Sequence, residues 1–182
     1  FFCYCFFSSK AVLFSGLDPS GPLFPQSAGL TQASATNVDV IHTDIIYGSL
    51  IPRGHVDFYP NGGRGQPGCA LTFATGRSAD PEKMTDQEKI KLIQQAASQT
   101  GRAIPIVDCS HQRALFYMIH SFRNPLCYTA GQTCDNIAFI PATCNDIPAN
   151  MRDGQMGYRA TLGRYMGNLY FKSGPISPFC SV

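Results

Sequence analysis

Two residues of this chain, Asp18 and His111, are of types that together support nucleophilic catalysis. Asp18 lies in a Gly- and Pro-rich run at 16–22 that follows the apolar stretch 11–14. That stretch predicts a strand, so Asp18 is expected on the turn that leaves it. His111 closes the run Cys-Ser-His at 109–111. An imidazole can shuttle a proton near neutral pH, and a carboxylate that accepts from its N–H fixes the tautomer. By residue type, the two could therefore supply the acid and the base of a Ser-His-Asp triad, although residue type alone is a weak signal.

Simpler roles compete with this interpretation. By residue type alone, Asp18 also suits a solvated turn and His111 a helix cap on the surface. Of the other histidines, His42 and His55 are expected to be hydrogen-bonded in the core and His120 to lie on a helix surface. Three further carboxylates stand in conspicuous blocks of sequence and compete for the role of the acid: Asp39, Asp44 and Asp57.

Four blocks of sequence favour a catalytic role for Asp18 and His111 over the simpler roles. In this order and approximate spacing they resemble the pancreatic-lipase-like family of secreted lipases and sn-1 phospholipases, over about residues 11–180. The blocks are GLDPSGP at 16–22, VDVIHTD at 38–44, GHVDFYPNGG at 54–63 and CSH at 109–111. The resemblance implies the α/β-hydrolase fold, with Asp18 as the triad acid and His111 as the base. It also implies hydrolysis of glycerolipid carboxylic esters, as a triacylglycerol lipase or a phospholipase A1.

The nucleophile of such a triad is missing from the sequence. Triads on this fold run Ser, Asp, His along the chain, with the Ser in a G-x-S-x-G motif. That motif does not occur here. We therefore expect the C-terminal portion of a catalytic domain, built on a mostly parallel sheet with flanking helices, with the Ser and the oxyanion hole upstream. Alone, the chain should be inactive. The alternative is a catalytically dead, lipid-binding relative of the yolk-protein type, against which the retention of Asp18 and His111 argues.

The chain contains eight cysteines. Their even number and wide spacing, without a C-x-x-C pair, favour disulfides over zinc and indicate an oxidising, extracellular compartment. Spacing alone leaves the connectivity open. The resemblance implies that Cys69 pairs with Cys109 and Cys134 with Cys144, which leaves Cys127 and Cys180 to fasten the tail. Cys3 and Cys5 fall outside it.

The segment 69–109, roughly 40 residues tied at its base, is the candidate lid over the site. Thr85 and Glu88 form a capping box that predicts a helix over about 86–98. Its apolar residues would contact lipid, and we name three of them: Ile90, Leu92 and Ile93. The length of the lid favours triacylglycerol, whereas the cysteine arrangement resembles that of the sn-1 phospholipase branches, so the choice of glycerolipid stays open.

The remaining pattern predicts the elements that position these residues. Strands are expected at 10–17, 38–42, 55–59 and 168–172, and a helix at 111–122. The apolar face of that helix would contain Leu115, Met118, Ile119 and Phe122, packed on the sheet, and Ala114 and Phe116 would widen it. Residues 1–9 remain unassigned, and no C-terminal β-sandwich domain is expected.

Composition excludes some function classes. The net charge of +2 gives no reason to invoke nucleic acid. The apolar start of the chain is too short to span a membrane and lacks the basic region of a signal peptide. Pancreatic-type relatives bind a structural calcium through carboxylates just before the VDVIHTD block. Residues 29–36 of this chain contain no Asp or Glu. We therefore predict no metal there, and no cofactor elsewhere.

Overall fold

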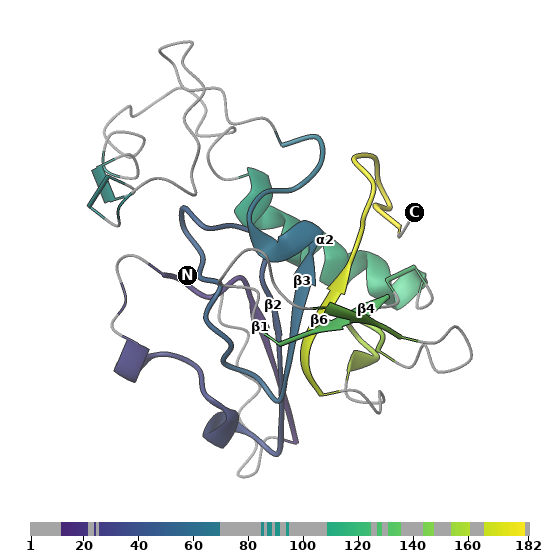
Figure 1. Cartoon of the computed structure of the whole chain (residues 1–182), viewed down its shortest axis with the longest axis horizontal. Coiled ribbons are helices and arrows are strands. Elements are labelled where there is room, and N and C mark those ends of the chain that lie inside the picture. The colour runs from purple at the N-terminus through teal and green to yellow at the C-terminus, as the bar shows by residue number, and fades with distance from the viewer. Residues whose placement is uncertain are drawn as a thin grey trace.

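The computed structural model contains a six-stranded, mostly parallel sheet at the centre of the fold (Figure 1). The strand order is β1-β2-β3-β6-β4-β5, in which β1, β2, β3 and β6 run parallel and β4 and β5 add an antiparallel edge. The strands are β1 (Leu13–Leu17), β2 (Asn37–Ile41), β3 (Val56–Pro60), β4 (Gln132–Cys134), β5 (Cys144–Asp146) and β6 (Gly167–Phe171). The structure describes residues 12–21, 24, 26–69, 85, 87–88, 90–91, 94, 109–124, 127–128, 131–135, 144–147, 154–160 and 166–180.

The four parallel strands are the four that the sequence predicts, with ends displaced by at most three residues. Apolar side chains alternate between two faces of the sheet. Phe58 on β3 and Leu169 on β6 pack in the main core, whereas Tyr59 packs in a second cluster with Cys134. Every residue of β3 is buried. Both of its faces are therefore covered, as is usual for strands in a parallel sheet.

Helix α2 (Cys109–Arg123) covers one face of the sheet (Figure 1). Ala114 and Tyr117 belong to the same buried cluster as Phe58 and Leu169. Short 3₁₀ helices lie in the connections: η1 (Gln26–Ala28), η2 (Gln32–Ser34) and η3 (Asn61–Gly63).

The helix itself is confirmed, and its predicted apolar face is confirmed in part, because Ala114 and Met118 pack against the main core. The side chains of Phe116, Ile119 and Phe122 are exposed. The buried positions lie about one residue earlier, at i, i+3, i+4, i+7 and i+11: Ser110, Arg113, Ala114, Tyr117 and Ser121. Polar residues occupy three of these positions because each makes hydrogen bonds there that offset its burial, such as Arg113 Nη2 to the Pro67 carbonyl.

Three disulfides hold the irregular connections. Cys69–Cys109 closes the segment before α2, and Cys134–Cys144 joins β4 to β5. Cys127–Cys180 ties the tail to the region after α2. These are the pairs that the resemblance implies; Cys3 and Cys5 lie outside the described residues. Within the described ranges, no helix combines the length and apolarity needed to cross a membrane.

Candidate active site

Asp18 lies at the first position after β1, on a turn with a left-handed backbone (φ 47°). Asp tolerates this conformation better than most residues other than Gly. Its N–H donates to the Ile41 carbonyl at 2.7 Å, which extends the parallel pairing of β1 and β2. The carboxylate is buried, and its Oδ1 accepts from the N–H groups of Thr43 (2.8 Å) and Asp44 (3.2 Å). The chain that follows β2 therefore fixes the orientation of this carboxylate.

His111 stands in the first turn of α2 and contacts the other oxygen of that carboxylate. Its Nδ1 lies 2.7 Å from Asp18 Oδ2. The His111 side chain is 29% exposed, whereas the Asp18 side chain is 0% exposed. Because a carboxylate only accepts hydrogen bonds, Nδ1 carries the proton of this contact. The imidazole is thus held in one tautomer with part of its surface toward solvent, as a general base requires.

The competing carboxylates have other partners. Asp39 Oδ1 accepts from the Ser15 hydroxyl at 2.8 Å. Asp57 accepts from the backbone N–H groups of Arg53 and Gly54 and lies 2.8 Å from His42 Nε2. Both carboxylates are buried, and each is hydrogen-bonded to the partners just named. Among the described carboxylates, Asp18 is the one within hydrogen-bond distance of His111.

Asp44 closes the loop that passes over Asp18. Its Oδ2 accepts from the N–H groups of Ile46 (2.9 Å) and Tyr47 (2.6 Å). Burial, and to a smaller extent the neighbouring Asp18 carboxylate, raise the pKa of Asp44 to about 7. Gly48 completes the loop, where a Cβ would lie only 2.4 Å from Asp18 Oδ1. A larger residue at this position would displace the carboxylate.

The other described histidines have structural contacts. His42 is fully buried, stacks on Tyr59 with ring centroids 4.5 Å apart, and places Nδ1 on the Ser49 carbonyl and Nε2 on Asp57. His55 Nδ1 accepts from the Val38 N–H at 3.0 Å. His120 is half-buried on α2. The core role expected for His42 is confirmed, whereas His55 makes the expected kind of hydrogen bond but is only half-buried.

A pH dependence follows from Asp39. Burial raises the pKa of its carboxyl to about 7, despite the bond from Ser15. An unfolded Asp titrates near 4, so the native state binds more protons between about pH 4 and pH 7, and stability falls as the pH rises through that window. The side chain of Asn carries no charge at any pH. The free energy of unfolding of Asp39→Asn should therefore exceed that of the parent by on the order of 2–4 kcal/mol at pH 8, and by little at pH 4. Urea unfolding at both pH values measures this. Asp146→Asn on the exposed strand β5 is the control, and equal gains at both pH values would contradict the prediction.

The candidate lid is described in part. Thr85 and Glu88 form the predicted capping box: the Thr85 N–H and hydroxyl donate to Glu88 Oε2, and the Glu88 N–H donates to Thr85 Oγ1. Helical residues follow at 87–88, 90–91 and 94. Ile90 is half-buried there, whereas Leu92 and Ile93 lie outside the described residues. The start of the helix is confirmed, and its contact with lipid stays a prediction.

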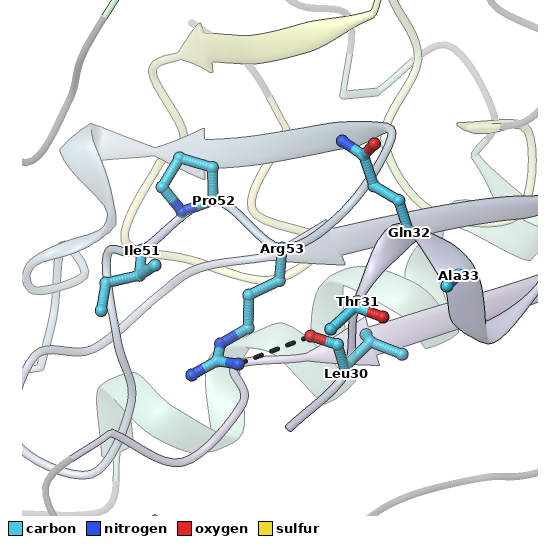
Figure 2. A pocket seen from close by; sticks show the side chains of 7 residues that line it. All are labelled: Leu30, Thr31, Gln32, Ala33, Ile51, Pro52 and Arg53. Carbon is cyan, nitrogen blue, oxygen red and sulfur yellow. Dashed lines mark hydrogen bonds between the residues drawn. The ribbon is translucent and has the colours of Figure 1, made fainter. Parts of the chain in front are cut away.

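An open pocket of about 440 Å³ lies where the segments 30–33 and 51–53 lead into β2 and β3 (Figure 2). Asp18 follows the carboxyl end of β1, so the pocket and the Asp18–His111 pair lie at opposite ends of the parallel strands. The Arg53 guanidinium donates to the Leu30 carbonyl at 3.4 Å, and a Cβ on Gly29 would lie 2.3 Å from its Nη1. The guanidinium of Arg53 therefore lies against the segment 29–36, which contains no carboxylate. A cation beside residues without anionic oxygens does not fit a calcium ion. In the described part of the chain, no three His, Cys, Asp or Glu side chains cluster as metal ligands would.

Sequence reasoning missed the residues that hold the pair in place. Thr43 and Asp44 anchor Asp18 through backbone N–H groups, which every residue type offers, so their identity gives little signal. The available sequence signal is their position shortly after the buried strand β2, since β1, which pairs with β2, ends one residue before Asp18.

Comparison with known proteins shows the family to which this chain is similar. The family described as Lipase matches residues 7–179. Lipase member H-A of Xenopus laevis is 34% identical over 145 residues, which cover 71% of this chain and 26% of the relative. Lipase member H of Rattus norvegicus is 34% identical over 134 residues (71% and 24%), and that of Danio rerio is 29% identical over 191 residues (97% and 36%). The chain thus spans about a quarter to a third of the length of these relatives. With the α/β-hydrolase arrangement of its sheet, it belongs to the lipase family.

Proposed function

We propose that the protein containing this chain hydrolyses carboxylic esters of glycerolipids with a Ser-Asp-His triad, of which Asp18 is the acid and His111 the base. One observation carries the proposal: a buried carboxylate, held by two backbone N–H groups, lies 2.7 Å from Nδ1 of a partly exposed imidazole. The family and its lipase-named members support the same reaction class.

The reaction would proceed in two stages, acylation of the Ser and hydrolysis of the acyl-enzyme. His111 Nε2 takes the proton of a Ser hydroxyl as its oxygen attacks the ester carbonyl, and the resulting imidazolium is stabilised by Asp18. When the tetrahedral intermediate collapses, that proton goes to the leaving alcohol. A water molecule then repeats the cycle on the acyl-enzyme, releasing the fatty acid and restoring the Ser. The nucleophile lies in a part of the protein outside this sequence, since no G-x-S-x-G occurs in it.

We also propose that the segment from Cys69 to Cys109 is a lid that opens at a lipid–water interface. The disulfide holds both ends of the segment together, directly before His111. Ile90, Leu92 and Ile93 would contact lipid when the lid opens. Three disulfides support a location outside the cell, where such bonds persist.

Fatty-acid release by the complete protein tests the function. Triacylglycerol emulsions and phosphatidylcholine vesicles should be compared at equal lipid surface, with binding to each surface measured in parallel. Release from either lipid supports the proposal and decides between lipase and phospholipase activity. Binding without release from both lipids would contradict it and favour the lipid-binding alternative. The isolated 182-residue chain, which lacks the motif of the nucleophile, should release nothing.

A further inference from the structure

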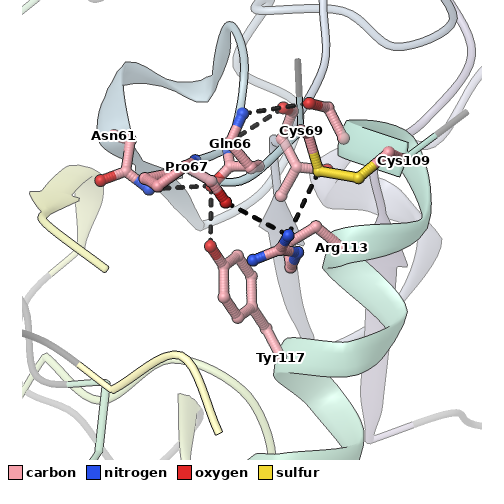
Figure 3. Close-up of a disulfide and its surroundings, with 9 residues drawn as sticks. Asn61, Gln66, Pro67, Cys69, Cys109, Arg113 and Tyr117 are labelled. Atoms are coloured by element: carbon pink, nitrogen blue, oxygen red, sulfur yellow. Dashed lines mark hydrogen bonds between the residues drawn. A yellow bond between two sulfur atoms is a disulfide. The ribbon is translucent and has the colours of Figure 1, made fainter. Parts of the chain in front are cut away.

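Gln66 is a buried side chain whose amide makes all four hydrogen bonds available to it. Its Nε2 donates to the carbonyls of Thr43 (3.1 Å) and Pro60 (3.0 Å). Its Oε1 accepts from Asn61 Nδ2 (2.9 Å) and from the Tyr117 hydroxyl (2.7 Å). Figure 3 shows the amide between the loop that follows β3 and helix α2. One side chain therefore connects the chain after β2, the end of β3 and the middle of α2.

Gln66 bonds to a residue adjacent to His111 and to a residue that holds Asp18. Thr43, whose carbonyl accepts from Gln66, donates its own N–H to Asp18 Oδ1 at 2.8 Å. The backbone N–H of Gln66 donates to the hydroxyl of Ser110 at 3.0 Å. Ser110 directly precedes His111 at the start of α2. Gln66 thus bonds to the residue that holds the acid and to the residue beside the base.

We propose that Gln66 is a positioning residue that sets the distance and orientation of His111 relative to Asp18. Asp18 and His111 are 93 positions apart in the chain and come from separate elements, so their 2.7 Å contact depends on how the start of α2 sits against the chain after β2. Gln66 bonds to both of these segments. The catalytic consequence rests on the proposed function, whereas the geometric claim does not.

The chemistry of the amide suggests a selective substitution. In Gln66→Glu the volume is kept, but a carboxylate oxygen would face the Thr43 and Pro60 carbonyls, which are both acceptors. Repulsion should push the Thr43 segment away and carry Asp18 with it. Tyr117→Phe is the matched control, because it removes one bond to the same amide and leaves the links to Thr43 and Ser110 in place.

The test compares both variants in the complete protein, with thermal unfolding as the measure of general damage. The first readout is the low-field proton NMR resonance of the His111 Nδ1–H, identified as the signal that His111→Ala removes. The second is the acid limb of the pH profile of kcat/KM. We expect Gln66→Glu to weaken or shift the resonance, to displace the acid limb and to lower kcat about 10- to 100-fold with KM nearly unchanged. Tyr117→Phe should move neither readout, even where its melting temperature falls as far.

Two results would overturn the proposal: an unchanged resonance and acid limb in Gln66→Glu, or equal changes in Tyr117→Phe. If Gln66→Glu does not fold, Ser110→Ala tests the other link of residue 66, because it removes the hydroxyl that accepts from the Gln66 backbone N–H, and it should shift the resonance. An unaltered resonance in that variant would likewise overturn it. The NMR readout needs no turnover, so a protein without hydrolytic activity would refute the proposed function while the role of Gln66 is still decided.

Discussion

Ester hydrolysis by the complete protein is expected to fall by about 10,000-fold or more when His111 is replaced by alanine. The variant loses the group that takes the proton of the nucleophile and returns it to the leaving alcohol. His111 is partly exposed and stands in the first turn of α2, so the fold should survive. Initial rates on a short-chain ester, with circular dichroism to verify folding, measure the effect.

His120→Ala is the matched control for this experiment. His120 stands on the same helix, near its other end, with Nε2 3.1 Å from the Ser177 hydroxyl. Its removal should leave kcat/KM within a few-fold of the parent value. If His111→Ala kept most of the activity, His111 would not be the base and the proposed triad would be refuted.

Asp18→Asn is expected to lower kcat by about 10,000-fold while the protein stays folded. The amide oxygen of the new Asn should take the place of Oδ1, because the N–H groups of Thr43 and Asp44 both need an acceptor there. Its NH₂ group would then face His111 Nδ1, which must accept that bond. The imidazole would be forced into the tautomer with its proton on Nε2, where it cannot take the proton of the nucleophile.

Asp44→Asn tests whether this effect belongs to Asp18 alone. Asp44 lies in the loop after β2 that passes over Asp18, and its carboxyl is already partly neutral near pH 7. An Asn oxygen can still accept from Ile46 and Tyr47, so activity at pH 7 should change only a few-fold. Comparable losses in the two variants would mean that general disturbance of the loop explains the result, and the tautomer argument would fail.

Helix α2 illustrates where sequence reasoning was sufficient and where it was not. Its apolar periodicity predicted the helix within two residues at each end. The same periodicity placed Ala114 and Met118 correctly against the core but missed the buried Arg113 and Ser110. These two are stabilised by partners on the segment 66–67, which no local pattern reveals. Apolar Phe116 and Ile119 remain exposed instead.

The sequence by itself determined the parallel strands, since the β-branched and apolar residues of a segment such as 38–41 leave little choice of local structure. It also singled out the two candidate catalytic residues, because Asp18 on a strand-end turn and His111 close after a cysteine stand in blocks that resemble a known family. The tertiary structure decided what those residues touch. The 2.7 Å contact of His111 with Asp18, the bonds of Asp18 with Thr43 and Asp44, and the links of Gln66 to both segments all join residues at least 23 positions apart. Such contacts form only when the sheet and α2 pack together, because local propensity extends over a few residues while a catalytic geometry depends on the whole domain.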